Sequence, residues 1–244
     1  DFISVTYGAG GSRSKRTVEL ASFIQNSLHI PAVAHMTCVG SSKEDILTVT
    51  DDMKQAGLSH VLALRGDRPT WMDDAQFENR AFAHASDLTR FLKEHTDLEV
   101  AGACYPEKHF EAANAQSDLQ YLKEKVDAGA DYIVTQMFFD NSKYFDFVER
   151  CRKAGITVPI IPGIKPISTP KHLEILPRTF SVSLPEELVK AVRACGEDTQ
   201  AAREVGIEWA IHQAKELKAA EVPIIHFYTM GRTDNIRKIA RNVF

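Results

Sequence analysis

The segment HVLALRGDRP (60–69) ends an apolar run with two opposite charges separated by a glycine. A buried strand that ends on Arg65, Gly66 and Asp67 would place a guanidinium group, a main chain without a Cβ and a carboxylate at one edge of a sheet. Gly66 would let a ligand approach the main chain closely, and a fixed carboxylate would stabilise a developing cation. By strand alternation, Arg65 and Asp67 should lie on one side of the strand. An ion pair between these two residues is the alternative.

Polar side chains also follow the other apolar runs. They comprise groups that can hydrogen-bond, stack or titrate, namely Thr6, Tyr7, His35, Tyr105, His109, Gln136, Lys165, Tyr228 and Arg232. Single residues have structural alternatives: His35 can be a hydrogen-bonded core histidine, and Gln136 can satisfy a buried main-chain group. Polar groups at seven successive strand ends nevertheless predict one pocket. Aromatic, amide and hydroxyl groups favour a flat heteroaromatic ligand with a phosphate tail.

Other kinds of site find less support in the sequence. Histidines and carboxylates show neither HxH nor HExxH spacing, so no metal site is predicted. There is no G-x-S-x-G nucleophile elbow. Lys125 and Lys165 keep a Schiff-base aldolase open as an alternative. Asp118 and Lys125 are two turns apart on a predicted helix, so they share one face and, with His109, could line a groove for a ribose and a diphosphate. A solvated helix face is the alternative.

The elements that must position these residues are short apolar runs alternating with helical patterns. The runs are 2–7, 32–38, 60–66, 99–105, 132–139, 158–164 and 223–229. Most are apolar on both faces, which is typical of parallel strands covered by helices. No GxGxxG turn follows a strand, which favours a (β/α)8 TIM-type barrel over an open doubly wound sheet. We predict a single barrel domain over residues 1–244 with seven of its eight strands evident, the first strand lying upstream of Asp1.

Helix boundaries follow from capping residues. Ser41 and Glu44 form a predicted capping box before a helix over 45–55. Asn141 is the predicted N-cap of a helix that ends at Arg152. The sequence Ser168-Thr169-Pro170 predicts a further helix start. Two more helices are expected at 186–195 and 199–220.

Composition sets the class of protein. The net charge of −4 argues against nucleic-acid binding, and no apolar run reaches the roughly 20 residues of a membrane span. The four cysteines are scattered without a CxxC, which favours reduced thiols. No leader pattern precedes Asp1. We therefore expect a cytoplasmic protein with small-molecule substrates and with neither a nucleic-acid nor a membrane partner.

Eight segments, in this order, carry a family resemblance: VTYGAGGS (5–12), AHMTC (34–38), LALRGD (62–67), YPEKH (105–109), LKEKVDAGAD (122–131), TQMFFD (135–140), IIPGIKPI (160–167) and HFYTMGR (226–232). With them the chain resembles the compact bacterial methylenetetrahydrofolate reductases. The resemblance implies noncovalent FAD, which NADH or NADPH reduces before leaving. In the implied second half-reaction, the reduced FAD converts 5,10-methylenetetrahydrofolate to 5-methyltetrahydrofolate, which supplies methyl groups for methionine synthesis. The resemblance also implies a homo-oligomer.

Matching positions imply roles for individual residues. The implied FAD contacts are Thr6, Tyr7, Ala9, His35, Arg65, Gly66, Asp67, His84, Tyr105, His109, Ala112, Asp118 and Lys125. The implied substrate contacts are Asp67, Gln136, Tyr228 and Arg232, with Asp67 and Gln136 as catalytic residues. Asp67 would stabilise an iminium cation on the folate and tune the flavin potential. Gln136 could donate and accept at the pterin edge.

The chain departs from the family pattern at several positions. His84 stands where relatives can have a tyrosine, and Glu124 stands where an arginine can contact the diphosphate. His172 and Leu176 replace an amide and an aromatic residue in the lid after the sixth strand of this chain. The family's glutamate proton donor is expected upstream of Asp1. Folate reduction needs that proton, so we expect flavin reduction to survive better than folate reduction.

Two further expectations concern retention of the flavin and the competing functions. The resemblance suggests that the turn at Ala130 influences how firmly flavin is held, because a larger side chain there would push the helix of Lys125 outward. A lysine-dependent aldolase and a non-catalytic flavin- or folate-binding barrel are the alternative functions.

Overall fold

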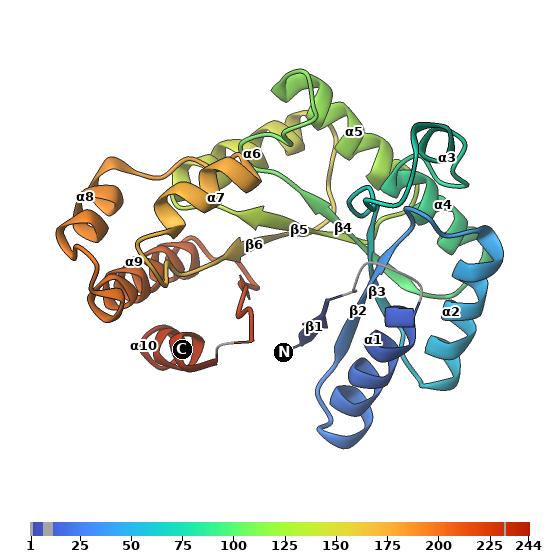
Figure 1. Cartoon of the computed structure of the whole chain (residues 1–244), viewed down its shortest axis with the longest axis horizontal. Helices are drawn as coiled ribbons and strands as arrows, with labels where there is room; N and C mark the ends of the chain where they lie inside the picture. The colour runs from blue at the N-terminus through green and yellow to red at the C-terminus, as the bar shows by residue number, and fades with distance from the viewer. Residues whose placement is uncertain (1, 7–11, 232) are drawn as a thin grey trace. The chain divides into compact units, whose positions relative to one another are not determined.

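A computed structural model describes residues 2–6, 12–231 and 233–244. In this part of the chain, seven strands form one sheet in the order β1 to β7 (Figure 1). They are β1 (Ile3–Val5), β2 (Ala32–Thr37), β3 (His60–Leu64), β4 (Glu99–Cys104), β5 (Tyr132–Met137), β6 (Ile160–Ile164) and β7 (His226–Phe227). Each lies within one of the predicted apolar runs.

The strand order identifies the fold class. The pairs β1–β2, β2–β3, β3–β4 and β6–β7 are parallel. Strands that are neighbours both in sequence and in the sheet are typical of a (β/α) barrel, whereas a doubly wound sheet reverses its order at a switch point. The predicted α/β fold with seven evident strands is therefore confirmed.

Helices separate the strands along the chain (Figure 1). They are α1 (Ser12–Ser22), the π-helix η1 (Phe23–Ser27), α2 (Lys43–Gln55), α3 (Asp74–Glu78), α4 (Ala85–His95), α5 (Ala115–Asp127), α6 (Asn141–Lys153), α7 (His172–Phe180), α8 (Glu186–Ala194), α9 (Thr199–Ala219) and α10 (Thr233–Val243). The helices expected at 186–195 and 199–220 are confirmed as α8 and α9. No helix in the described ranges is both long and apolar enough to span a bilayer.

The predicted helix caps are displaced by one or more residues. The capping box of α2 is formed by Ser42 and Asp45, because the Ser42 hydroxyl accepts from Asp45 N and the Asp45 carboxylate accepts from Ser42 N. Asp140, not Asn141, caps α6, accepting a hydrogen bond from Ser142 N. Helix α7 begins only at His172, beyond the predicted start. Adjacent residues with the same capping chemistry explain the first two differences.

The chain divides into two compact units. Unit 1 comprises residues 1–103 and 122–133, and unit 2 comprises residues 104–121 and 134–244. The single domain expected over residues 1–244 stays a prediction.

The core of unit 1 covers both faces of its strands. One face packs against the helices through Ala34, Met36, Val61, Ala63, Val100, Ile46, Met53, Leu88 and Leu92. The other face forms a smaller cluster of Val33, Leu62 and Ala101 with Phe2, Leu64 and Tyr132. Apolar residues on both faces agree with the predicted parallel sheet.

The core of unit 2 joins the end of β5 to α7, α8 and α9. Its buried residues include Met137, Phe139, Ile167, Leu176, Leu188, Val192 and Ala202. Trp209 on α9 donates from Nε1 to Phe139 O at 2.9 Å, and Asn141 donates to Gln213 O at 3.0 Å. These bonds satisfy main-chain carbonyls where α9 passes the end of β5, so the helix has a defined position within its unit.

Candidate functional site

The ends of β2 and β3 in unit 1 are joined beyond the strands themselves. Val39 N donates to Arg65 O at 2.8 Å, and Cys38 N donates to Leu64 O at 3.1 Å. Gly66 has φ +85°, and a Cβ there would lie 2.9 Å from both Thr37 Cβ and Val39 Cγ1. Position 66 therefore requires glycine for its backbone conformation and for its contact with the neighbouring strand end.

Arg65 and Asp67 lie beyond the end of β3, contrary to the expectation that they belong to the strand. β3 ends at Leu64 and the main chain turns at Gly66 with φ +85°, so strand alternation does not set the directions of these two side chains. Arg65 Nε donates to Gly66 O at 3.2 Å. Asp67 is exposed, whereas Arg65 is half-buried. The ion pair between them stays the alternative prediction.

A buried thiol ties two predicted cofactor residues together. Cys38 Sγ lies 3.8 Å from Arg65 O and 3.9 Å from His84 O. Burial raises the pKa of this thiol to about 12, so it stays protonated and can donate to a carbonyl. His84 is the N-cap residue of α4, where its N–H donates to the Asp87 carboxylate at 2.9 Å and its side chain is exposed.

The other predicted residues of unit 1 lie on separate elements. Thr6 is exposed after β1, and its carbonyl accepts from Thr17 Oγ1 at 3.1 Å. His35 is half-buried on β2, in register with Leu62 of β3. Lys125 runs from α5 across Gly102 of β4 and donates to Ala103 O.

Four predicted cofactor residues of unit 2 are brought together around the YPEKH loop. Asp118 on α5 accepts from His109 N at 3.0 Å, and the Tyr105 ring meets the His109 ring edge-on at 4.6 Å. The buried Ala112 donates from its N–H to His109 O at 3.1 Å. His109 Nδ1 accepts from Glu111 N at 3.1 Å, so in the neutral ring the proton is on Nε2.

A second group in unit 2 lies on β5, β6 and the end of β7. Tyr228 donates from its hydroxyl to Thr135 O at 2.7 Å, and its ring lies on Gly163. A Cβ at Gly163 would lie 2.6 Å from Tyr228 Cε2 and 2.5 Å from Thr135 O. Burial raises the pKa of Tyr228, so its hydroxyl remains a donor. Gln136 is half-buried, and its Oε1 accepts from Met137 N at 2.9 Å, which orients the side-chain NH2 group.

The remaining positions singled out in the sequence have defined surroundings. Lys165 is half-buried after β6, and burial lowers its pKa. Leu176 is 2% exposed and belongs to the core of unit 2, so it cannot stack on a ligand. His172 Nδ1 accepts from Ser168 N at 3.2 Å, and Glu124 is exposed on α5.

Three predicted positions, Tyr7, Ala9 and Arg232, lie outside the described residues. In the ranges that the structure does describe, no group of three or more His, Cys, Asp or Glu side chains could hold a metal ion.

One residue near the end of β3 belongs to none of the motifs singled out in the sequence. Trp71 lies in the loop after β3 and is 63% exposed. The available signal was its place: a tryptophan two residues after Pro69, between a polar strand end and the next helix. Exposed aromatic residues on loops of a rigid scaffold are more often used in binding than in packing.

Comparison with known proteins decides the family. The family model for methylenetetrahydrofolate reductase matches residues 1–243. The chain belongs to the methylenetetrahydrofolate reductase family. The 5,10-methylenetetrahydrofolate reductase of Escherichia coli (strain K12) is 37% identical over 233 residues, covering 96% of this chain and 77% of the relative. The methylenetetrahydrofolate reductase (NADH) 1 of Arabidopsis thaliana is 37% identical over 94% of this chain and 41% of its own length.

A solved structure supports the fold. An uncharacterised protein from Clostridium thermocellum that binds two copies of 5-methyl-5,6,7,8-tetrahydrofolic acid matches with a TM-score of 0.60 and 14% identity, over 98% of this chain and 92% of that chain. The predicted family is thus confirmed by sequence and the fold by structure. Membership of the methylenetetrahydrofolate reductase family also favours a reductase over an aldolase.

Proposed function

We propose that this chain reduces 5,10-methylenetetrahydrofolate to 5-methyltetrahydrofolate, with NADH or NADPH as the reductant and FAD as a noncovalent cofactor. The observation that carries the proposal is the family match over residues 1–243, together with relatives at 37% identity. The product would supply methyl groups for methionine synthesis. Both substrates are small molecules, in agreement with the composition.

The chain's residues fit a flavin at the end of β3. The main chain turns at Gly66 with φ +85°, directly after the half-buried Arg65. A guanidinium group at this turn suits a phosphate or a ribityl hydroxyl as hydrogen-bond acceptor. When bound, FAD would accept hydride from the nicotinamide and deliver it to the folate. The contacts proposed for unit 1 are Thr6, Tyr7, Ala9, His35, Arg65, Gly66, Asp67, His84 and Lys125, and those proposed for unit 2 are Tyr105, His109, Ala112 and Asp118.

Asp67 is the residue proposed to act on the folate. Its carboxylate is exposed after the turn at Gly66, so a ligand can approach it. Opening of the folate's methylene bridge creates positive charge on an iminium group, and a nearby carboxylate would stabilise that charge. We propose that Gln136, Tyr228 and Arg232 also bind the substrate. For Gln136, the bond from Met137 N holds the amide in one orientation.

Anaerobic half-reactions test the proposal. The purified protein should show flavin absorbance, NADH or NADPH should bleach it, and methylenetetrahydrofolate should restore it with formation of 5-methyltetrahydrofolate. Asp67→Asn should slow the folate half-reaction by about 100-fold, the loss typical of removing one such electrostatic group. Asp51→Asn, which removes an exposed carboxylate from α2, is the matched control and should leave both rates unchanged. A protein that takes up no FAD would contradict the proposal.

The aldolase alternative has one observation in its favour. Lys165 is half-buried with a lowered pKa, as a Schiff-base lysine requires. Borohydride treatment in the presence of carbonyl substrates would then attach a substrate to Lys165, whereas a reductase should show no adduct. Flavin binding without turnover of either half-reaction would instead indicate the binding-protein alternative.

A further inference from the structure

The loop between β3 and α4 presents a tryptophan to solvent although its neighbour is buried. Trp71 is 63% exposed, whereas Met72 is 6% exposed. An indole ring in water forgoes a large apolar contribution to stability, since aromatic side chains bury about 150–250 Å² each when they are packed. Its exposure on a loop at the carboxyl ends of the strands therefore suggests a function in binding.

Two arginines hold this loop from within. Arg68 donates to Met72 O from Nη2 at 2.8 Å and from Nε at 3.1 Å, and its Nη2 lies 2.7 Å from the Asp74 carboxylate. Arg80 stacks on the Phe77 ring, with 3.9 Å between its guanidinium carbon and the ring centroid. Arg80 also donates to the carbonyls of Phe77 and Ala83. These groups are engaged inside the loop, so they order it in advance of any ligand.

The tryptophan itself is anchored along one edge. A turn closed by Met72 N and Pro69 O, 3.1 Å apart, sets the backbone around position 71. The ring packs on Gly40 in the loop after β2, where a Cβ would lie 3.4 Å from Trp71 Cη2 and 3.5 Å from Cζ2. Gly40 also has φ +76°, which disfavours a side chain at that position. The result is a fixed ring with most of its surface in solvent, which lowers the entropy lost on binding.

The position of the Trp71 ring indicates which part of a substrate it could contact. Trp71 is four residues after Asp67, so the chain separates them by at most about 14 Å. In methylenetetrahydrofolate a neutral p-aminobenzoyl ring follows the pterin after a one-carbon link. In NADH the adenine is separated from the nicotinamide by a diphosphate, which the exposed carboxylates of Asp67 and Asp73 would repel. Leu176, the lid position at which an aromatic residue was expected, is buried and offers no ring.

We propose that Trp71 is a substrate-binding residue that stacks on the p-aminobenzoyl ring of the folate. This inference rests on the proposed function. It adds to the proposed contacts a residue that sets affinity for the folate and leaves the reductant unaffected.

Steady-state kinetics of the FAD-loaded enzyme test the proposal. Trp71→Ala should raise the KM for methylenetetrahydrofolate by about 5- to 20-fold, the range expected for loss of one stacking ring. The KM for the nicotinamide substrate should stay within twofold, and Trp71→Phe should recover most of the loss. Phe23→Ala is the matched control: it removes another exposed aromatic ring of unit 1, which precedes β2 and so lies away from the carboxyl ends. An unchanged folate KM, or a rise confined to the nicotinamide KM, would overturn the proposal.

Fluorescence gives a readout that does not need turnover. The chain has two tryptophans, so Trp209→Phe leaves Trp71 as the single emitter. Addition of p-aminobenzoylglutamate to this variant should quench and shift the emission in a saturable manner, and a spectrum unchanged up to millimolar probe would refute the stacking. If the wild-type enzyme reduced no methylenetetrahydrofolate, the proposed function would fail, while the quenching experiment would still decide whether Trp71 binds the ring.

Discussion

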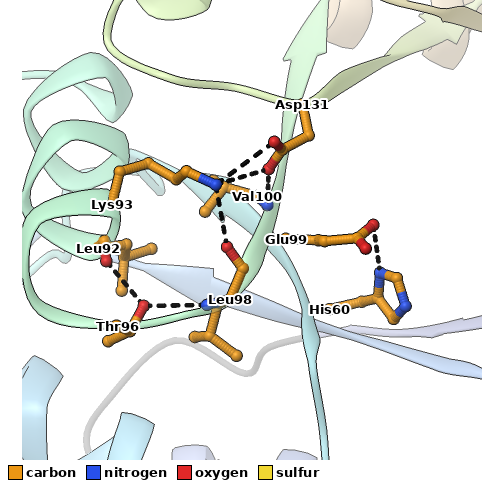
Figure 2. Close-up of polar contacts among 8 residues, drawn as sticks. All are labelled: His60, Leu92, Lys93, Thr96, Leu98, Glu99, Val100 and Asp131. Carbon is orange, nitrogen blue, oxygen red and sulfur yellow. Dashed lines mark hydrogen bonds and ion pairs between the residues drawn. The ribbon is translucent and has the colours of Figure 1, made fainter.

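The ammonium group of Lys93 on α4 lies 3.1 Å from the carboxylate of Asp131, and that carboxylate accepts a hydrogen bond from Val100 N at 2.7 Å (Figure 2). Lys93 also donates to Leu98 O at 3.3 Å. Its stem lies on Gly129, where a Cβ would be 2.8 Å from Lys93 Cγ. One lysine and one aspartate therefore join the end of α4, the start of β4 and the turn between α5 and β5.

Removal of the Asp131 carboxylate should loosen this junction. We expect Asp131→Ala to lower the free energy of unfolding by about 2 kcal/mol, because Val100 N loses its acceptor and Lys93 its counter-ion. Asp131→Asn, which keeps an acceptor oxygen, should lose about 1 kcal/mol or less because the pair is partly exposed. Urea unfolding measures both. Glu149→Gln breaks the exposed pair of Glu149 with Lys153 and should have no measurable effect. Equal losses for the two Asp131 variants would contradict the role of the Val100 bond.

Ala130, next to this junction, should be sensitive to size. It is 3% exposed, and its N–H donates to Lys125 O at 3.4 Å at the end of α5. Ala130→Val adds two methyl groups to a packed site, which typically lowers stability by about 1–3 kcal/mol. We expect faster loss of FAD on dilution, measured by flavin fluorescence, because Lys125 shares the displaced segment. The same substitution at the exposed Ala194 should leave flavin release unchanged.

Gly102→Ala should displace the side chain of Lys125 without unfolding the protein, so it tests whether Lys125 contacts FAD. The new Cβ would lie 2.6 Å from Lys125 Cδ, a flexible side-chain atom that can move away. We expect near-normal folding but weaker FAD binding, by about tenfold, if one charged contact is lost. Gly163→Ala is the contrasting variant, since its Cβ would meet Thr135 O at 2.5 Å and main chain cannot yield as easily. Gly163→Ala should therefore lower the unfolding temperature. For Gly102→Ala, an unchanged FAD affinity would argue against Lys125 as a cofactor contact.

His226 on β7 should make stability depend on pH. Burial lowers its pKa from 6.5 to about 4, so between these values the unfolded chain binds a proton that the folded chain does not. Folding is therefore favoured fully above pH 6.5 and loses stability as the pH falls toward 4, by up to about 3 kcal/mol from this residue. His226→Gln should flatten the dependence of the unfolding free energy on pH over that range. His212→Gln, at an exposed position on α9, should leave the slope as it is.

Several features of the site could be predicted from the sequence because they are local. Short apolar runs that alternate with helical patterns predict the seven strands of the described residues, since period and composition depend only on neighbouring residues. Ordered segments such as LALRGD and YPEKH predict the family that the comparison confirms. The N-cap of α2 could not be predicted to the residue. Ser41 and Ser42 both carry a hydroxyl that can accept a main-chain hydrogen bond, and only the first residue of the helix decides which of them is the cap.

The sequence by itself determined which residues stand at the strand ends, and therefore the fold class and the family. Tertiary structure decided what those residues can reach. The turn at Gly66 packs against Thr37 and Val39 from the neighbouring strand end, so Arg65 and Asp67 lie outside the strand to which alternation would apply. The position of the Trp71 ring depends on Gly40, which belongs to the loop after the neighbouring strand β2. Contacts between separate segments decide the turn at Gly66 and the position of Trp71. The residue pattern within one segment therefore could not predict them.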